Sequence, residues 1–191
     1  MKNIEKVGKI KMITGCMFSG KSEELLRIIR QIKIAGILFK IFTYDTGYRS
    51  TTLTTHDGKT IEVLPMTNAA LIPQLVPYNV MVVGIDNAHL FGLSIKDCVD
   101  TLLEHKKQVI VSGLDMDFRG QPFEPIAYLM GKADDVKKLH AICTVCGKEA
   151  VLTQRLINGV PAKHTDPLIM IGGEVTGVTY EARCRLHHVM R

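Results

Sequence analysis

The chain has 191 residues, of which 46% are hydrophobic and 23% are charged, and its formal net charge is +5. These are the proportions of a globular protein that buries a core in one domain, or in one domain with a small appendage. The positive surplus suits an anionic ligand but is too small and dispersed to indicate nucleic acid binding, and no apolar run approaches the length of a membrane span.

The first part of the chain predicts a strand, a glycine-rich turn and a helix. Residues 9–14 form a short β-rich run. After the turn, apolar residues recur at i, i+3, i+4 and i+7, which predicts a helix with one buried face. These residues are Leu25, Ile28, Ile29 and Ile32. Residues 37–44 are again rich in β-forming residues, and we expect them to pair beside the first strand. The polar stretch that follows contains Asp57-Gly58, a hairpin signal.

The middle of the chain alternates between strands and helices. Residues 80–85 are an apolar run that ends in Asp86, which predicts a strand buried on both faces. We expect a helix after Ser94, a good N-cap residue, and another buried strand at residues 109–114. This alternation predicts an α/β fold with a mainly parallel sheet.

The chain changes character after residue 139. Cysteine pairs and scattered Gly and Pro replace the periodic pattern. We therefore place a boundary near residue 140, between a nucleotide-binding domain (1–140) and a small C-terminal subdomain (141–191).

Residues 15–22 match the phosphate-binding pattern G-x-x-x-x-G-K-[ST] without a gap. The glycines let backbone N–H groups turn toward phosphate oxygens, and the N-terminus of the following helix adds its positive dipole end. Lys21 would reach the β- and γ-phosphates of ATP, and the Ser22 hydroxyl would ligate Mg²⁺. A chance match in a glycine turn is the alternative, but a strand and a helix flank the pattern as the motif requires. The predicted ATP-binding residues are Gly15, Cys16, Met17, Phe18, Ser19, Gly20, Lys21 and Ser22.

Asp86 is a candidate second ligand for Mg²⁺. It closes a buried strand, the position of the carboxylate that holds the metal in proteins with this loop. Taken alone, an Asp at the end of a strand is more often a turn residue. Together with the upstream loop it predicts a magnesium site formed by Ser22 and Asp86.

Two chelating pairs in the last third of the chain predict a zinc site. Cys143-x-x-Cys146 and Cys184-x-x-His187 have the ligand spacing of tetrahedral zinc, and three thiolates with one imidazole form a closed, structural set. His188 is an alternative fourth ligand, and an incidental C-x-x-C is the alternative to a metal site.

The cysteines also bear on the cellular compartment. They are odd in number, and the potential ligands sit in metal-like pairs rather than spread through the chain. Residues 1–6 have no hydrophobic stretch behind their charges, so we expect no signal peptide. We expect a reduced, cytoplasmic protein without nucleic acid or membrane partners.

These motifs resemble one family closely: the type II thymidine kinases, the zinc-containing form with a RecA-like P-loop domain. The resemblance extends over nearly the whole chain. The matching segments are GCMFSGKSEEL (15–25), VGID (83–86), GLDMDFRGQPF (113–123), KLHAIC (138–143), TQRL (153–156) and YEARCR (180–185).

The resemblance implies a RecA-like domain and a C-terminal zinc subdomain whose lasso-like loop closes over thymine. It implies ATP, Mg²⁺ and structural Zn²⁺ as cofactors, deoxythymidine as the acceptor of phosphate at its 5′-hydroxyl, and a homotetramer. Lys21 and Asp86 would be catalytic. By matching position, the walls of the nucleoside pocket would be Met17, Leu114, Phe118 and Phe123; the base contacts would be Thr153 and the backbone of Met170, Ile171, Gly172 and Gly173; and Tyr180 would lie against the sugar. From the residues alone, Met17, Leu114 and Phe123 would be ordinary core.

Three features depart from the family's pattern. The family has a Glu after the strand-ending Asp, which accepts the proton of the 5′-hydroxyl; this chain has Asn87, and an amide cannot be a general base. The family's Arg before the Tyr of its flap motif is Gly47 here, with Arg49 as a candidate substitute. The segment between Gly173 and Tyr180 is longer than usual.

These departures leave fold and ligand class unchanged but predict attenuated turnover. Phosphoryl transfer passes through a loose transition state, and a general base contributes on the order of 10²- to 10⁴-fold, so its loss would leave a slow kinase. His89 is a candidate surrogate base, because it would point to the same side as Asn87 if the strand continued. A lone His there is more often a packed or solvent residue. The alternative function is a catalytically inactive relative that binds nucleotide or thymidine for sensing or regulation.

Overall fold

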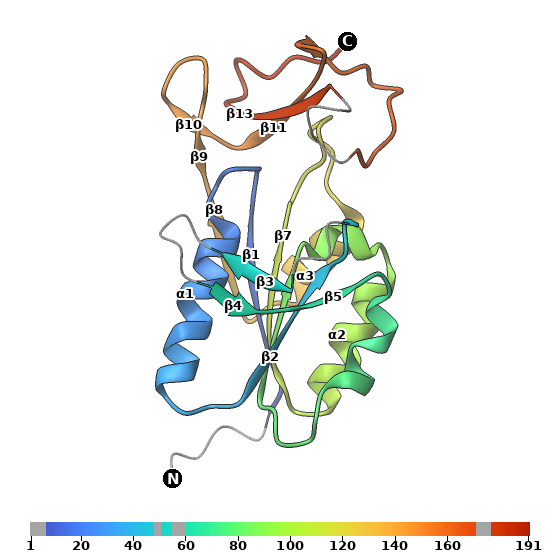
Figure 1. Cartoon of the computed structure of the whole chain (residues 1–191). Helices are drawn as coiled ribbons and strands as arrows, with labels where there is room; N and C mark the ends of the chain where they lie inside the picture. Colours follow the sequence, from blue (N-terminus) through green and yellow to red (C-terminus); the bar gives the residue numbers. More distant parts are fainter. Residues whose placement is uncertain (1–6, 48–50, 55–59, 171–176) are drawn as a thin grey trace.

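The computed structural model describes residues 7–47, 51–54, 60–170 and 177–191 (Figure 1). Its centre is a six-stranded sheet in the order β5-β2-β6-β7-β1-β8, and every neighbouring pair is parallel. This confirms the α/β fold with a mainly parallel sheet. The strands are β1 (Lys9–Gly15), β2 (Phe39–Tyr44), β5 (Leu64–Met66), β6 (Val82–Asp86), β7 (Gln108–Gly113) and β8 (Asp135–Leu139).

Helices cover both faces of the sheet (Figure 1). On one face, α1 (Lys21–Ile34) packs through Leu25 and Ile29, which are fully buried, so the predicted helix face is confirmed. On the other face, α2 (Ser94–Glu104) and α3 (Glu124–Lys132) enclose the larger core cluster together with three 3₁₀ turns. These turns are η1 (Ala69–Leu71), η2 (Pro73–Leu75) and η3 (Ala88–Phe91).

The structure corrects the predicted position of β2 in the sheet. Strand β2 pairs with β5 and β6, and both β6 and β7 lie between it and β1. The expectation that it pairs beside the first strand is therefore wrong. The physical reason is burial: β6 is buried at every residue and β7 at all but the first, whereas only the middle of β2 is buried. The most apolar strands take the centre of the sheet, whatever their order in the chain.

Two local predictions have mixed outcomes. Helix α2 begins at Ser94 itself, with Leu93 in the N-cap position, so the prediction of Ser94 as N-cap is wrong. The Ser94 hydroxyl instead donates a hydrogen bond to Phe91 O at 2.9 Å and is thus engaged by the preceding turn η3. Asp57-Gly58 lies outside the described residues, but strands β3 (Thr52–Thr54) and β4 (Thr60–Glu62) on either side of it are antiparallel, as a hairpin requires.

The C-terminal part lies at the carboxyl ends of β1 and β7 (Figure 1) and forms two small antiparallel sheets. Its strands are β9 (Ala141–Ile142), β10 (Glu149–Ala150), β11 (Leu152–Ile157), β12 (Val160–Pro161) and β13 (Val178–Arg183). A small buried cluster joins it to the rest of the chain, because Cys16 packs there against Ala141, Cys143 and Ala150. A domain boundary near residue 140 remains a prediction.

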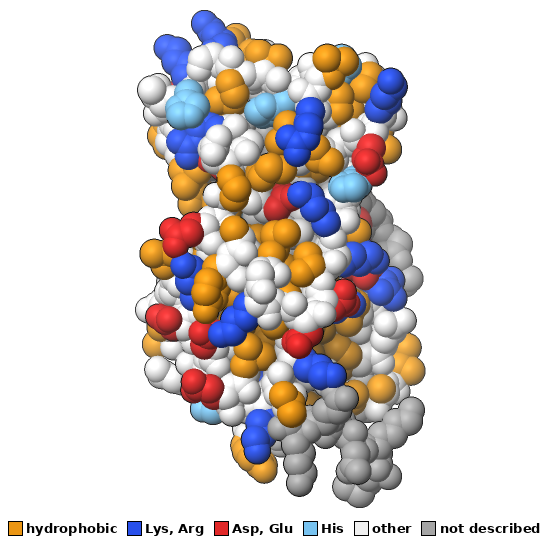
Figure 2. All heavy atoms as spheres, turned by 180° about the vertical axis from the view of Figure 1, so that it is seen from behind, with side chains coloured by type: hydrophobic (Ala, Val, Ile, Leu, Met, Phe, Trp, Pro, Cys, Tyr) orange, Lys and Arg blue, Asp and Glu red, His pale blue; other side chains and the backbone are white. Residues whose placement is uncertain are grey.

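The surface carries charges of both signs. On the face seen in Figure 2, basic and acidic side chains are interspersed over the part of the molecule that contains the large sheet. Among the described residues, no helix combines the length and the apolar character needed to cross a bilayer.

Glu24 joins helix α1 to strand β8. Its carboxylate accepts hydrogen bonds from Arg27 Nε at 2.7 Å and from Lys137 Nζ at 2.9 Å. The hydrogen bond from Arg27, helped by Lys137 and opposed by burial, lowers the pKa of Glu24 from 4.5 to about 2. Because the folded-state pKa lies below the unfolded value, this stabilisation is complete above pH 4.5 and is lost as the pH falls toward 2.

We therefore expect Glu24→Gln to lower the free energy of unfolding at pH 7 by about 2 kcal/mol, less than the full shift implies because both cationic partners are half exposed. The difference from the wild type should shrink as the pH falls from 4.5 toward 2. Urea unfolding at a series of pH values measures both effects. Glu104→Gln, at an exposed position on α2, is the matched control. An equal pH dependence for Glu24→Gln and the wild type would contradict the assignment.

Candidate active site

The phosphate loop connects β1 to α1 through residues in the left-handed region. Phe18 has φ 63° and Gly20 has φ 81°, and the second is a conformation that glycine adopts without steric cost. The helix begins at once, because Glu24 N donates to Gly20 O at 2.9 Å. The unpaired N–H groups of the first turn of α1 therefore open at the loop, where they favour an anion.

Gly15 lies at a close approach of two strands. It has φ 138°, and a Cβ atom at this position would lie 2.2 Å from Leu139 O at the end of β8. That distance is far inside a van der Waals contact, so the start of the loop admits no side chain.

Lys21, Ser22 and Asp86 converge beside the loop. Lys21 Nζ donates to Cys16 O at 2.6 Å, and burial lowers the pKa of its ammonium group. Ser22 Oγ donates to Asp86 Oδ2 at 2.9 Å, and Asp86 is buried. A hydroxyl and a carboxylate side by side supply the oxygen ligands that Mg²⁺ prefers, so these residues fit that cation.

A cavity of about 430 Å³ opens next to the loop, within the size range of small-molecule sites. All the predicted nucleoside-contacting side chains among the described residues border it, and so do Asn87 and His89. They are Met17, Leu114, Phe118, Phe123, Thr153, Met170 and Tyr180. Ile171, Gly172 and Gly173 lie outside the described residues.

The loop itself divides into two sides. Met17, Phe18, Lys21 and Ser22 border the cavity. Cys16 faces the other way, and its Sγ donates to Ala150 O at 3.4 Å. The Cys16 side chain is therefore a packing group, and its predicted contact with ATP could come only from its backbone. Gly15, Ser19 and Gly20 do not border the cavity either, and the Ser19 hydroxyl shapes the loop by donating to the carbonyl of residue 16 at 2.8 Å.

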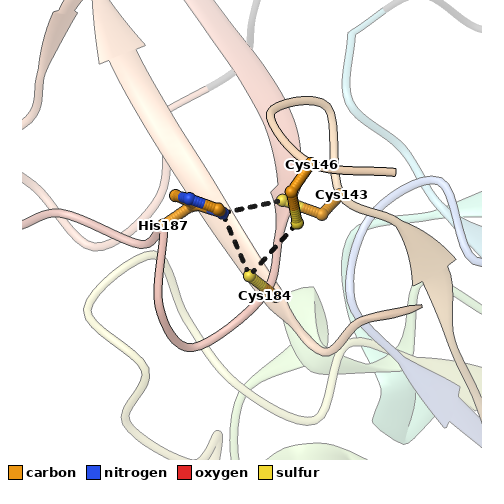
Figure 3. A group of neighbouring side chains, drawn as sticks. All are labelled: Cys143, Cys146, Cys184 and His187. Carbon is orange, nitrogen blue, oxygen red and sulfur yellow. Dashed lines mark hydrogen bonds between the residues drawn. The ribbon is translucent and has the colours of Figure 1, made fainter. Parts of the chain in front are cut away.

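The four predicted zinc ligands come together on the C-terminal part (Figure 3). One ligand atom from each of Cys143, Cys146, Cys184 and His187 lies within 4.8 Å of all the others. The separation is 3.9 Å between the sulfurs of Cys146 and Cys184, and His187 Nδ1 lies 3.8 Å and 3.3 Å from the sulfurs of Cys143 and Cys184. A tetrahedral zinc ion places such ligand atoms roughly 3.4–3.8 Å apart, so the donor set fits that metal.

The structure also separates the two histidines. His188 Nε2 lies 2.9 Å from Phe118 O and therefore faces the loop between β7 and α3, whereas His187 faces the sulfurs. His187 is the fourth member of the cluster.

Comparison with known proteins identifies the family. A sequence model described as "Thymidine kinase" matches residues 8–188. The chain belongs to the thymidine kinase family. It is also 46% identical over 191 residues to a protein named thymidine kinase from Coprothermobacter proteolyticus, and the match covers 98% of this chain and 94% of that protein. The chain is accordingly a kinase.

In this thymidine kinase chain, the strand does not continue past Asp86. Asn87 is left-handed, with φ 53° and ψ 35°, and η3 follows it. The premise that strand geometry places His89 beside Asn87 is therefore wrong, although both residues border the cavity. Asn tolerates this backbone conformation better than most residues because its short polar side chain can hydrogen-bond locally.

His89 is poorly suited to accept a proton. Its Nδ1 accepts a hydrogen bond from Leu114 N at 3.3 Å, which assigns the ring proton to Nε2, and its ring packs 5.0 Å from that of Phe123. Burial, and to a smaller extent Lys21, lowers the pKa of His89 to about 3. Neither ring nitrogen is available as a base in this arrangement, which favours the packed-histidine interpretation.

Gly47 occupies a tight turn in which its N–H donates to Asp45 Oδ1 at 2.8 Å. Its φ of 90° lies in a region that side chains disfavour. The family's arginine would thus be strained in this backbone. Arg49 and residues 171–176, which include half of the longer segment, lie outside the described residues.

Sequence reasoning missed several residues of this cavity. The cavity is also bordered by Thr46, Leu90, Asp117, Arg155, Leu168 and Ile169. A further pair lies beside the phosphate loop, where the buried carboxylate of Asp115 is 2.7 Å from Lys138 Nζ. The family resemblance could have pointed to three of them, because the segments 113–123 and 153–156 that match the family contain Asp115, Asp117 and Arg155. Their residue types alone do not distinguish them from ordinary loop and strand residues.

We predict one zinc ion per chain, bound by the four clustered residues. A structural zinc contributes folding free energy directly, so its removal should loosen the C-terminal part and, through Cys16, the phosphate loop. Metal analysis of protein purified without added zinc measures the stoichiometry. His187→Ala should reduce the zinc content, whereas His188→Ala should leave it unchanged. Removal of all metal from the wild-type protein without a change in its melting temperature would refute the site.

Proposed function

We propose that this kinase transfers the γ-phosphoryl group of ATP to the 5′-hydroxyl of thymidine. The observation that carries the proposal is that the phosphate loop and the aromatic walls border one cavity. A donor loop and an acceptor pocket that share one cavity can hold the two substrates in reacting contact, which is most of what phosphoryl transfer needs. Membership of a kinase family favours catalysis over a purely sensory nucleotide-binding relative.

The donor would bind over residues 15–22. Its phosphates would accept hydrogen bonds from the loop backbone and from the first turn of α1. Lys21 would exchange the carbonyl of Cys16 for phosphate oxygens, a trade that strengthens a charge-assisted hydrogen bond. Ser22 and Asp86 would hold Mg²⁺, which when bound neutralises charge on the β- and γ-phosphates.

The acceptor would bind at the aromatic end of the cavity. Phe118 and Phe123 are buried and present flat apolar surfaces suited to a planar base. Thr153 Oγ1 accepts a hydrogen bond from Met17 N at 3.0 Å, so its hydroxyl can still donate to a carbonyl of the base. Tyr180, on β13, would lie against the sugar.

Among the described residues that border the cavity, the one carboxylate, Asp117, and the one imidazole, His89, are both engaged and cannot readily accept the proton of the 5′-hydroxyl. Asn87 occupies the family's base position and can only orient the hydroxyl by hydrogen bonding. Asp117 borders the cavity, but its Oδ1 accepts hydrogen bonds from the backbone of Arg119 and Gln121 and its Oδ2 from the Arg119 side chain. We therefore propose an attenuated kinase in which positioning and charge neutralisation supply most of the rate.

The proposal is tested by measuring thymidine monophosphate formation from radiolabelled thymidine and ATP. We expect turnover by the wild type. In Lys21→Ala the turnover rate should fall by roughly 10²-fold or more, because that variant lacks the ammonium group that stabilises the transferring phosphate. The melting temperature should change little, since Lys21 lies outside the core. Unchanged ATP affinity and turnover in Lys21→Ala would remove the phosphate-loop assignment.

Asn87→Glu should raise the rate, because it restores a carboxylate within reach of the hydroxyl. The gain is bounded by the contribution of a general base, roughly two to four orders of magnitude. The variant should also be about 1 kcal/mol less stable, because Glu tolerates the left-handed backbone less well. The gain should disappear below the pKa of the new carboxyl. Asn87→Gln, with the same length and no charge, is the matched control and should gain nothing.

A companion variant, His89→Gln, distinguishes the source of the remaining rate. We expect a change of less than about tenfold and an unaltered pH–rate profile near neutrality, because the ring is neutral and its Nδ1 is engaged. A larger loss with a lost ionisation would make His89 the working base after all.

The family resemblance also implies a homo-oligomer, which we retain as part of the proposal. Light scattering of the purified enzyme measures its mass in solution. A monomer at all concentrations would contradict that part alone.

A further inference from the structure

Arg155, on strand β11, is a buried cation at the nucleoside end of the cavity. It is 2% exposed and borders the cavity. Within the described part of the chain, its hydrogen bonds go to backbone carbonyl oxygens and to a phenol rather than to a carboxylate. Burying a charge in this way is expensive, and a position that served packing alone could be filled with less cost by an apolar side chain.

The guanidinium group of Arg155 binds a short segment of backbone through its planar fork. Nη1 donates to Pro167 O at 2.5 Å, and Nη2 donates to Leu168 O at 2.6 Å. Nε donates to the Tyr180 hydroxyl at 3.0 Å, and that hydroxyl in turn donates to Met170 O at 2.5 Å. One arginine, directly and through the phenol that it orients, thus engages three carbonyl groups within four residues.

Residues 167–170 have few other means of keeping their position. They belong to no helix or strand, and Leu168 and Ile169 are 41% and 49% exposed, so the segment buries little apolar surface of its own. Leu168, Ile169 and Met170 nevertheless border the cavity. The shape of this wall therefore depends on the hydrogen bonds that end at Arg155.

The guanidinium also contacts a second wall of the cavity. Its central carbon lies 3.8 Å from the centroid of the Phe118 ring, within the range of a cation–π contact. Phe118 belongs to the loop between β7 and α3 and is itself buried. Arg155 thus stands between two walls that lie far apart in the sequence, and it contacts both.

We infer that Arg155 is a positioning residue for the nucleoside: it holds the 167–170 segment and Phe118 at a set spacing, so that the base enters a preformed slot. This inference rests on the proposed function, in which that end of the cavity binds thymidine. Preorganising a wall before binding removes the cost of ordering it when the ligand arrives, so the effect falls on thymidine affinity rather than on the chemical step.

A lysine cannot replace this arrangement. Its single ammonium is a point charge without the planar fork that reaches two carbonyls and a phenol at once, and it does not stack on an aromatic ring in the same way. Arg155→Lys therefore keeps the buried charge and removes the geometry.

We expect Arg155→Lys to raise the KM for thymidine by roughly 10- to 100-fold, while the KM for ATP and the zinc content stay within about twofold of the wild type. A role in fold stability alone would instead lower the melting temperature and the active fraction without separating the two KM values. Arg183→Lys is the matched control, because Arg183 lies in the same small sheet and pairs with Glu181 rather than with the cavity wall. It should leave both KM values unchanged.

Hydrogen–deuterium exchange in the absence of substrate provides a second measurement that needs no activity. The amides of residues 168–170 should exchange faster in Arg155→Lys than in the wild type, and to a lesser extent in Tyr180→Phe, which loses only the bond to Met170 and the acceptor for Nε. Unchanged exchange there, or an unchanged KM for thymidine in an active enzyme, would overturn the inference. A wild type that phosphorylates no thymidine would instead refute the proposed function, and the exchange data would still decide the role of Arg155.

Discussion

The contact between the phosphate loop and the C-terminal part holds the two halves of the cavity together. Cys16 packs into the small buried cluster that includes the zinc ligand Cys143, and its neighbour Met17 donates its N–H to the Thr153 hydroxyl on β11. The loop that would bind the donor is therefore hydrogen-bonded to β11, the same strand that carries residues of the acceptor end. Any loosening of the C-terminal part would therefore also loosen the phosphate loop, although more than a hundred residues of sequence separate the two.

The two ends of the cavity are built differently. The donor end comes from one continuous stretch, residues 15–22, with Asp86 added from the buried strand β6. The acceptor end is assembled from the loop after β7, from β11 and β13, and from the segment 167–170, which are far apart in the sequence. Arg155 lies where these pieces meet. A site of this kind can change its acceptor preference through single contacts while the donor end stays the same.

The sequence was sufficient where the chemistry is local. The phosphate loop, the buried helix face and the strand that ends in Asp86 each depend on residues close together in the chain. The four zinc ligands form two such short pairs, which are far apart in the chain but share one ligand spacing, and the structure brings the two pairs together as predicted. The order of strands was not predictable in this way, because β2 is displaced from β1 by the greater burial of β6 and β7. His89 was misjudged because its proposed role required the strand to continue to residue 89, whereas the left-handed Asn87 ends it at Asp86. Arg155 was overlooked because its partners are backbone carbonyls, which leave no trace in the residue types of the segment that it holds.

Gly15 shows how a sequence motif can mean more than one thing. It is the first glycine of the nucleotide-binding pattern, yet what excludes a side chain there is the carbonyl of Leu139 on a neighbouring strand, 2.2 Å from where a Cβ would lie. The demand comes from the packing of β1 against β8, not from a phosphate. A descendant that had stopped using ATP would still keep this glycine for as long as it kept the sheet. A glycine at this position in a diverged relative therefore indicates the same fold. Nucleotide binding is better indicated by a lysine at the position of Lys21, which no packing contact requires.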